Sequence, residues 1–274
     1  MITTFVSNSS SERVTTATET NLEEALLLLA RHSPGGEVVE ATGFARYTTG
    51  VPHPFANGVL RTRLTSSNVA SEVRKILEHF KAVGLPMMWF VTPSSRPADL
   101  GKHLVAQGAT RGNNNPAMSV DLDALQPIID LPAGVEIREV DSPMMMAEWA
   151  RVACEGSGIP QDVGRLFTSA SDAIGLGEQV SMRYFLAYQS GIPVATSNLF
   201  LAAGVAGIYC VSTLLNARRQ GLGAAITLAP LLVARDLGYR IGVLQATAMG
   251  LPLYQRLGFT ECCSFDTYTY NVGE

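Results

Sequence analysis

Apolar positions in the second half of the chain follow two spacings, one typical of strands and one typical of helices. Two strand-like runs are separated by Gln189-Ser190-Gly191, which predicts a hairpin turn. A third strand leads into a long apolar run at helical spacing, and Gly258 is placed to end a short helix that begins near Met249. The predicted strands are 135–140, 182–188, 193–201, 207–213, 241–246 and 262–270, and the long helical run is 225–237.

The first half repeats this pattern when its numbering is shifted by 154, and by 150 after a further four-residue insertion. Two similar α/β halves explain the repeat, and a chance match between general α/β patterns is the alternative. Pro127 and Pro132 place the boundary within 126–133, which gives halves of 1–127 and 128–274. The matched segments are 70–84 with 224–238, 88–91 with 242–245, 100–110 with 250–260, and 118–122 with 265–270.

The segment between the strand 207–213 and the helical run predicts an anion site. Gly221 and Gly223 lack Cβ atoms, so a phosphate can approach the backbone closely. Free N–H groups at the helix start point at such a group, and the helix dipole favours its charge. Arg218 and Arg219 can add charge-assisted hydrogen bonds.

Two other phosphate-binding motifs fit this segment poorly. There is no Gly-Lys-Ser/Thr ending, so the segment is not a P-loop. Ile226 stands where the third glycine of a dinucleotide-binding motif belongs. A tight turn with surface arginines remains the plain alternative.

The spacing Arg218-x-x-Gly221-x-Gly223 resembles the pyrophosphate-binding loop of the GNAT acyltransferase superfamily, and Tyr254-x-x-x-Gly258-Phe259 resembles a second GNAT signature. The order of predicted elements from about Val135 onward is similar as well. The resemblance implies an α/β (α+β) fold of tandem GNAT-like halves. Each half would hold a mixed, mostly antiparallel sheet flanked by helices.

The resemblance also implies the chemistry, in which an amine attacks the thioester of an acyl-CoA, with acetyl-CoA as the default. The backbone at Val211 and Thr213 would pair with the pantetheine arm of CoA. The first half would be degenerate, because its matching positions lack the charge, the glycines and the phenol. Leu64 stands at the position of Arg218, Ser67 at that of Gly221, Val69 at that of Gly223 and Leu104 at that of Tyr254. The pyrophosphate would be held by Arg218, Arg219, Gln220, Gly221, Leu222, Gly223 and Ala224.

Tyr254 is the candidate general acid, because a phenol with a pKa near about 10 is protonated at neutral pH. A core tyrosine whose hydroxyl caps a backbone group is the alternative. The general base is not evident, since the strand 207–213 has no glutamate. Glu155, in a predicted turn, is a second catalytic candidate or a solvated carboxylate. Four other residues have open roles: Asn198 and Tyr209 as pocket residues, and His53 and Asn57 as pocket residues or parts of a turn.

Composition narrows the function classes further. The chain has 274 residues, 47% hydrophobic, and a net charge of −4, which argues against a general nucleic-acid binder. No secretory signal or membrane-spanning run is evident, so we expect a cytoplasmic protein without membrane partners. The four cysteines lack metal-ligand spacing, and we expect reduced thiols and no metal cofactor.

The leading hypothesis is an acyl-CoA-dependent N-acetyltransferase whose acceptor is a small-molecule or protein amine. A non-catalytic acyl-CoA-binding or regulatory module is the alternative, favoured by the missing strand glutamate. A pure interaction protein would require the Arg-Gly segment to be accidental. The sequence leaves the oligomeric state open, a homodimer included.

Overall fold

The computed structural model describes residues 11–125, 131 and 133–272. Within it the chain forms two compact units. Unit 1 combines residues up to 25 with 116–262, and unit 2 combines 26–115 with residues from 263 onward. The units therefore differ from the sequence halves 1–127 and 128–274. Residues 126–130 and 132, within the predicted boundary, lie outside the described residues.

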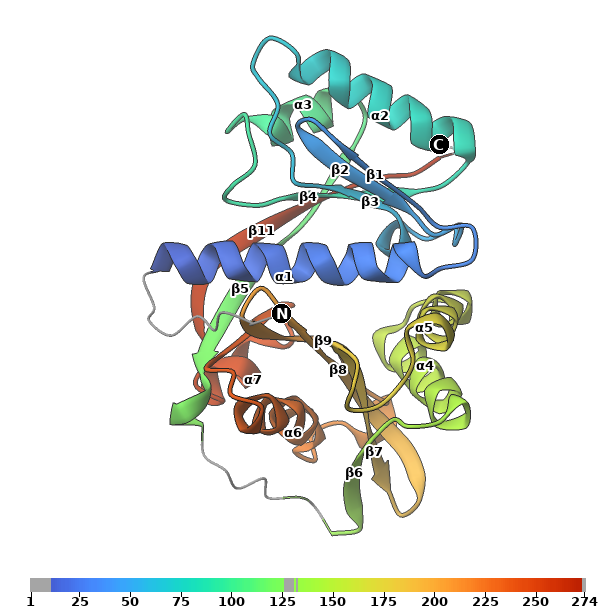
Figure 1. Ribbon diagram of the computed structural model, residues 1–274, viewed down its shortest axis with the longest axis vertical. Helices are drawn as coiled ribbons and strands as arrows, with labels where there is room; N and C mark the ends of the chain where they lie inside the picture. The colour runs from blue at the N-terminus through green and yellow to red at the C-terminus, as the bar shows by residue number, and fades with distance from the viewer. Residues whose placement is uncertain (1–10, 126–130, 132, 273–274) are drawn as a thin grey trace. The chain divides into compact units, whose positions relative to one another are not determined.

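Unit 1 is built on a twisted sheet with the strand order β5-β10-β9-β8-β7-β6. Helices α4 and α5 lie on one face of this sheet, and α6 and α7 lie on the other (Figure 1). Its strands are β5 (Thr110–Asp121), β6 (Val135–Glu139), β7 (Met182–Gln189), β8 (Ile192–Ala202), β9 (Val205–Thr213) and β10 (Ile241–Gln245). Its helices are α4 (Pro143–Ser157), α5 (Gln161–Ile174), α6 (Leu222–Asp236) and α7 (Leu251–Arg256).

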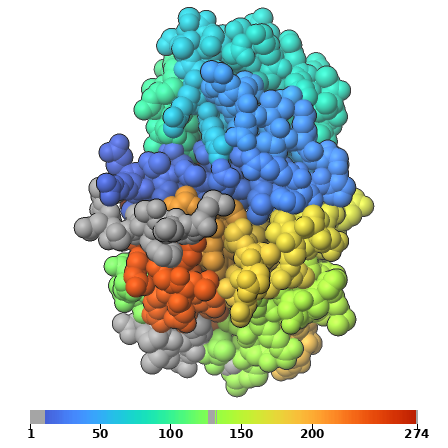
Figure 2. All heavy atoms as spheres, viewed as in Figure 1, coloured from blue at the N-terminus to red at the C-terminus, as the bar shows by residue number. Residues whose placement is uncertain are grey.

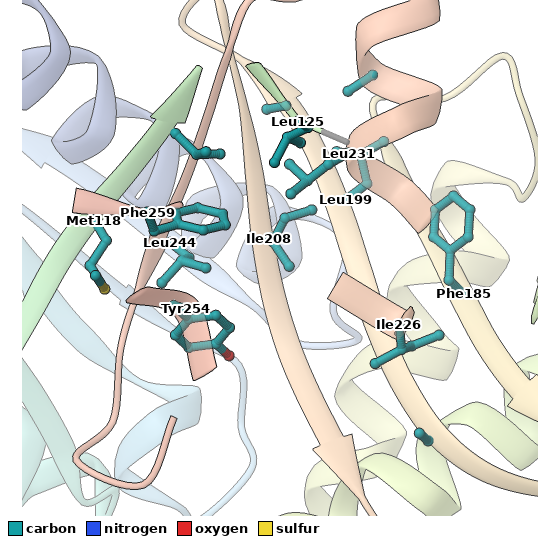
Figure 3. Packing of buried hydrophobic residues seen from close by; sticks show 14 of the residues in the cluster. Met118, Leu125, Phe185, Leu199, Ile208, Ile226, Leu231, Leu244, Tyr254 and Phe259 are labelled. Atoms are coloured by element: carbon teal, nitrogen blue, oxygen red, sulfur yellow. The ribbon is translucent and has the colours of Figure 1, made fainter. Parts of the chain in front are cut away.

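The core of unit 1 lies between the sheet and α6. Ile226 and Leu231 of α6 pack against Leu199 and Ile208 of the central strands, and all four are buried (Figure 3). The side chains of α6 and α7 also reach the surface, as the orange-red atoms in Figure 2 show. The predicted helical run and the strand before it are thus confirmed, with α6 beginning three residues earlier than expected.

Helix α1 (Ser11–Arg31) is shared between the units, and its residues up to Ala25 belong to unit 1. There Ala17 packs against Val205 and Val243. Asn21 is fully buried and binds the turn between β8 and β9. The sequence halves alone did not predict that this helix would serve the second-half sheet.

Unit 2 holds a sheet with the strand order β1-β2-β3-β4-β11, covered by two helices. Its core centres on the buried side chains of Trp89, Phe80 and Leu104. The strands are β1 (Glu37–Ala41), β2 (Phe44–Thr48), β3 (Gly58–Leu60), β4 (Met87–Val91) and β11 (Thr260–Tyr270). The helices are α2 (Val69–Val83) and α3 (Leu100–Ala106).

The repeat predicted from the sequence is confirmed in the elements. Shifting by 154 carries β4 onto β10 and α2 to within one residue of α6, and shifting by 150 carries β5 onto β11. The shift of 154 does not extend back to the strand before the helix. Gly58 and Ala206 hold equivalent places, because they pair in parallel with Met88 and Gly242, so the shift is 148 at this strand. The second half thus has six more residues between this strand and the next helix.

The last strands of the two halves are exchanged. Strand β5 follows α3 but pairs with β10, while β11 follows α7 but pairs with β4, both antiparallel. The segment Asn113-Asn114-Asn115-Pro116, whose residues disfavour strands, lies inside β5. Contacts with β11 compensate for its weak strand propensity. The hydroxyl of Thr267 donates to the Asn113 carbonyl at 3.2 Å, and the Asn114 amide donates to Asp266 at 2.8 Å.

No helix in the described part of the chain is long and apolar enough to cross a membrane.

Candidate functional site

Strands β9 and β10 in the middle of unit 1 separate after a short parallel stretch. They are matched at Ala206 with Gly242 and at Gly207 with Val243. Strand β9 continues for six more residues to Thr213 without a matched partner on β10. Buried polar backbone normally finds a partner, so this open edge offers hydrogen-bonding groups to an added strand-like ligand.

A β-bulge lies on the open part of β9. Thr196 of β8 is matched with Ser212, whereas Asn198 is matched with Tyr209, so two β9 residues stand opposite Ser197. One of the two, Cys210, has a φ of 51°, which an L residue rarely adopts. The side chains of Tyr209, Cys210, Val211 and Thr213 are only half-buried although β9 is an inner strand. Bulges of this kind redirect the chain next to functional sites.

The segment after β9 presents a row of free amides. Ala217 ends a short 3₁₀ helix, and α6 begins at Leu222. The backbone N–H groups of residues 219–223 make no hydrogen bond within the described part of the chain. Arg219 and Gly221 both have positive φ, 65° and 82°. Successive amides in such a conformation form a concave anion-binding nest, here at the positive end of a helix dipole.

The two arginines of this segment have different surroundings. Arg218 donates from Nε to the Thr213 carbonyl at 3.0 Å and from a terminal nitrogen to the Gly156 carbonyl at 2.8 Å. It therefore fastens the segment to the end of β9 and to α4. Arg219 is exposed, and its side chain has no hydrogen-bond or ion-pair partner among the described residues. The Gln220 amide group accepts a hydrogen bond from Gln189 at 2.8 Å.

The two glycines are needed for different reasons. Gly221 precedes α6 in the left-handed region, and a Cβ atom there would meet open space. A Cβ atom on Gly223 would lie 3.2 Å from Leu253, so this glycine allows α6 and α7 to approach. Leu222 points into the core, and the Ala224 amide donates to the Gly221 carbonyl at 3.1 Å. Leu222 can therefore contribute only its amide, and Ala224 has no free amide to offer.

Tyr254 is held at the edge of the core with its hydroxyl free. Its ring packs edge-on against Phe259, with ring centres 5.9 Å apart, and its oxygen points away from that ring (Figure 3). Burial raises the pKa of Tyr254 from 10.0 to about 12. The hydroxyl makes no hydrogen bond within the described residues, so the alternative of a backbone-capping core tyrosine is not supported.

Glu155 lies in the last turn of α4, not in the turn predicted from the sequence. Its exposed carboxylate pairs with Arg151 one helical turn away, at 3.0 Å. Thr247, exposed after β10, accepts a hydrogen bond with its hydroxyl from the Gly250 amide at 3.2 Å. Neither side chain forms a hydrogen bond with Tyr254 in the described part of the chain.

A row of polar side chains crosses the sheet face beneath α4. Tyr184, Asn198 and Tyr209 are matched directly across β7, β8 and β9, so their side chains share one face. The ring of Trp149 from α4 lies 4.9 Å from that of Tyr184 on this face. The Tyr184 hydroxyl and the Asn198 oxygen are buried without a partner among the described residues. Buried orphan polar atoms are uncommon and often mark functional sites.

The first half closes the equivalent opening with its own chain. Beyond Val59, Arg96 forms a parallel bridge with Arg63. The Arg96 amide donates to the Thr62 carbonyl at 2.8 Å, and the Leu64 amide donates to the Arg96 carbonyl at 3.1 Å. The Val69 amide, at the start of α2, donates to the Thr65 carbonyl at 3.0 Å. This part of the first half therefore has no open strand edge, and its amides at the start of α2 are interrupted by those of Asn68 and Val69, which both donate to the Thr65 carbonyl.

His53 and Asn57 organise a turn, one of the two roles predicted for them. The His53 ring accepts from the Phe55 amide at 3.2 Å. The Asn57 side chain binds the backbone of Thr49, Val51, His53 and Pro86. The four cysteines form no disulfide bond, and the described residues contain no cluster of three potential metal ligands.

Comparison with known proteins gives the fold. No protein-family model matches the chain, and no curated protein matches it either. A GCN5-related N-acetyltransferase from Kribbella flavida superposes with a TM-score of 0.71 at 22% identity, over 97% of this chain and 98% of that one. A GCN5-related N-acetyltransferase from Sphaerobacter thermophilus gives 0.63 at 14% identity, over 95% and 90%.

A third similar solved structure is described as a tandem GNAT protein. It is a tandem GNAT protein from the clavulanic acid biosynthesis pathway, with a TM-score of 0.62 at 14% identity, over 97% of this chain and 95% of that one. The coverage extends over both halves in each case. The resemblance inferred from two short motifs is thus confirmed for the fold, and this chain has the GNAT fold in its tandem form.

Proposed function

We propose that this protein is an N-acetyltransferase that uses acetyl-CoA and acylates an amine. The observation that carries the proposal is the row of unbonded amides at 219–223 beside the open edge of β9. A pyrophosphate fits the first feature and an amide-containing pantetheine arm fits the second. CoA contains both groups, joined in this order.

The residues divide the tasks as follows. The backbone at Val211 would pair with the pantetheine arm, and the amides of 219–223 with Arg219 would hold the pyrophosphate. Arg218 acts through the backbone, because its guanidinium is committed to the Thr213 and Gly156 carbonyls. Leu222 and Gly223 would contribute their amides only.

The reaction is a direct transfer. The neutral acceptor amine attacks the carbonyl carbon of the thioester, the C–S bond breaks, and the nitrogen loses a proton to solvent. Tyr254 donates its phenolic proton to the leaving thiolate and regains one from solvent. The raised pKa keeps this phenol protonated at neutral pH, and its hydroxyl is not engaged elsewhere in the described chain.

Catalysis by the second half alone is supported by the first half, where the chain itself fills the corresponding strand opening. The Arg96 segment occupies the place that an added strand would take beside Thr62–Leu64. The first half would then serve as a scaffold. The competing function, an acyl-CoA-binding module, is favoured by the exposed position of Glu155, which leaves no evident general base.

The test combines binding with turnover. Calorimetry should show CoA binding to the wild-type protein, and Gly221→Val should abolish it, because a side chain would fill the open space that the phosphate needs. Ser67→Val is the matched control, since Ser67 is the first-half counterpart of Gly221 and is exposed. Wild-type affinity in Gly221→Val would overturn the site.

A panel of amine acceptors with acetyl-CoA, read by thiol release, then separates the two functions. Acceptor-dependent release supports the enzyme. Tight CoA binding with no release for any amine would support the binding module.

A further inference from the structure

The floor of the opening between β9 and β10 is shaped by Gly207. This residue is part of the last matched pair before the strands separate, opposite Val243. A Cβ atom at Gly207 would lie 2.7 Å from Cε2 and 2.9 Å from the hydroxyl of Tyr209. The tyrosine ring therefore lies directly over the Gly207 backbone, at the point where the opening ends.

Tyr209 is fixed in this position by a residue of α1. Its hydroxyl donates to Oδ1 of Asn21 at 2.6 Å. The Asn21 amide nitrogen donates to the carbonyls of Phe200 at 3.2 Å and Ala202 at 3.0 Å, with a longer contact to Val205. Asn21 is fully buried, so both ends of its side chain are saturated and its rotamer is determined. The ring of Tyr209 thus cannot turn without breaking a buried hydrogen bond.

Tyr209 is nevertheless not fully enclosed. Tyr209, Cys210 and Val211 are half-buried, whereas Ile208 and the residues before it in β9 are buried. Tyr209 is thus the innermost residue of β9 that solvent or a ligand can reach. It stands two residues from the fork and next to the bulge at Cys210.

We propose that Tyr209, held by Asn21, ends the acyl site and restricts the protein to short acyl groups such as acetyl. The inference rests on the function proposed above, because an acyl chain carried by a pantetheine arm along β9 would run toward this ring. A long chain must displace the ring and break its bond to Asn21, or leave the groove. Tyr209 is therefore a specificity-determining residue, and Asn21 helps to position its ring.

The test is the affinity of the full chain for CoA, acetyl-CoA, butanoyl-CoA and hexanoyl-CoA, measured by calorimetry without an acceptor. Wild-type protein should bind hexanoyl-CoA at least about tenfold more weakly than acetyl-CoA, because even single methylenes are discriminated by such factors. Tyr209→Ala should remove most of this difference. Tyr209→Leu, which keeps an apolar side chain but shortens it, should give an intermediate ratio if the alanine variant does not fold.

Tyr209→Phe is the matched control. It keeps the ring and loses only the bond to Asn21, so it should retain much of the preference for acetyl-CoA. Equal wild-type affinity for acetyl-CoA and hexanoyl-CoA, or an unchanged ratio in both shortened variants, would overturn the acyl-length role while leaving the proposed function intact. Failure of the folded wild-type protein to bind CoA or any of the thioesters would overturn both.

Discussion

The hydroxyl of Ser197 donates a hydrogen bond to the Ile226 carbonyl at 2.6 Å. This is the carbonyl that Pro230, four residues later in α6, leaves without a helical donor because proline has no N–H. Both Ser197 and Ile226 are fully buried. Strand β8 thus supplies the hydrogen bond that α6 lacks at Pro230.

This relationship predicts a coupled effect on stability. Ser197→Ala should lower the free energy of unfolding by about 1–3 kcal/mol, because it leaves a buried carbonyl unpaired. In a Pro230→Ala background the restored N–H can reach the same carbonyl, so Ser197→Ala should cost much less. Urea denaturation of the four proteins measures the coupling. An equal loss in both backgrounds would show that the hydroxyl does not compensate for the proline.

Replacing each of the two arginines should affect CoA binding and thermal stability differently. Arg219→Ala should weaken CoA binding by roughly 1.5–3 kcal/mol, with an unchanged melting temperature, because Arg219 is exposed and unpaired among the described residues. Arg218→Ala should lower both the affinity and the melting temperature, since its guanidinium holds two carbonyls. Calorimetry and thermal melting on the same samples check this. Identical behaviour of the two variants would contradict the division of roles.

Tyr254→Phe should reduce turnover by about 10²–10⁴-fold and leave CoA affinity nearly unchanged, because only the proton donor is removed. The melting temperature should change little, since the hydroxyl bonds to nothing in the described chain. Thiol release under saturating acetyl-CoA gives the rate. Normal turnover in the phenylalanine variant would end the case for Tyr254 as the acid.

Buried phenols predict alkaline unfolding. Burial raises the pKa values of Tyr254 and Tyr188 from 10.0 to about 12, with a hydrogen bond to Glu148 adding to the shift at Tyr188, and burial also raises those of Tyr184 and Tyr47. The folded protein holds these protons more tightly than the unfolded chain, so stability is intact below pH about 10 and falls as the pH rises toward about 12. Urea midpoints and tyrosinate absorbance should change together. Tyrosinate formation near its ordinary pH in a protein that stays folded would contradict this burial.

CoA should bind once per chain. The first-half opening is filled by Arg96, whose backbone bonds with Thr62 and Leu64. A titration should therefore give a stoichiometry of one, and Gly221→Val should abolish all binding. Two sites of similar affinity would mean that the Arg96 segment opens.

Local patterns predicted the helices and strands around the candidate site better than they predicted which strands pair. The glycine and arginine spacing located the start of α6 to within three residues, since a helix N-terminus is determined by a few neighbouring residues. The repeat between the halves was visible because buried helices and strands keep their periodicity. The packing role of Gly223 was not predicted, because its contact with Leu253 depends on how two helices pack.

Features that depend on distant residues were missed. The strand β5 could pair with either neighbour without changing its pattern of buried positions, so its exchange with β11 left no trace in the sequence. The contact between Asn21 and Tyr209 joins residues that lie far apart in the chain. The bulge at Cys210 arises from a register shift against β8, which no single strand reveals.

The exchanged strands also determine the order in which the two units can be completed during translation. Domains usually fold as they emerge, the earlier-encoded one first. Here most of unit 2 is translated before unit 1, yet β4 receives its neighbour β11 only after α7 has been made. In unit 1, by contrast, β5 has already been synthesised when its partner β10 emerges. The unit that is mostly translated first is therefore the last to be completed, and a nascent chain must carry it with one edge of its sheet open until β11 has been made.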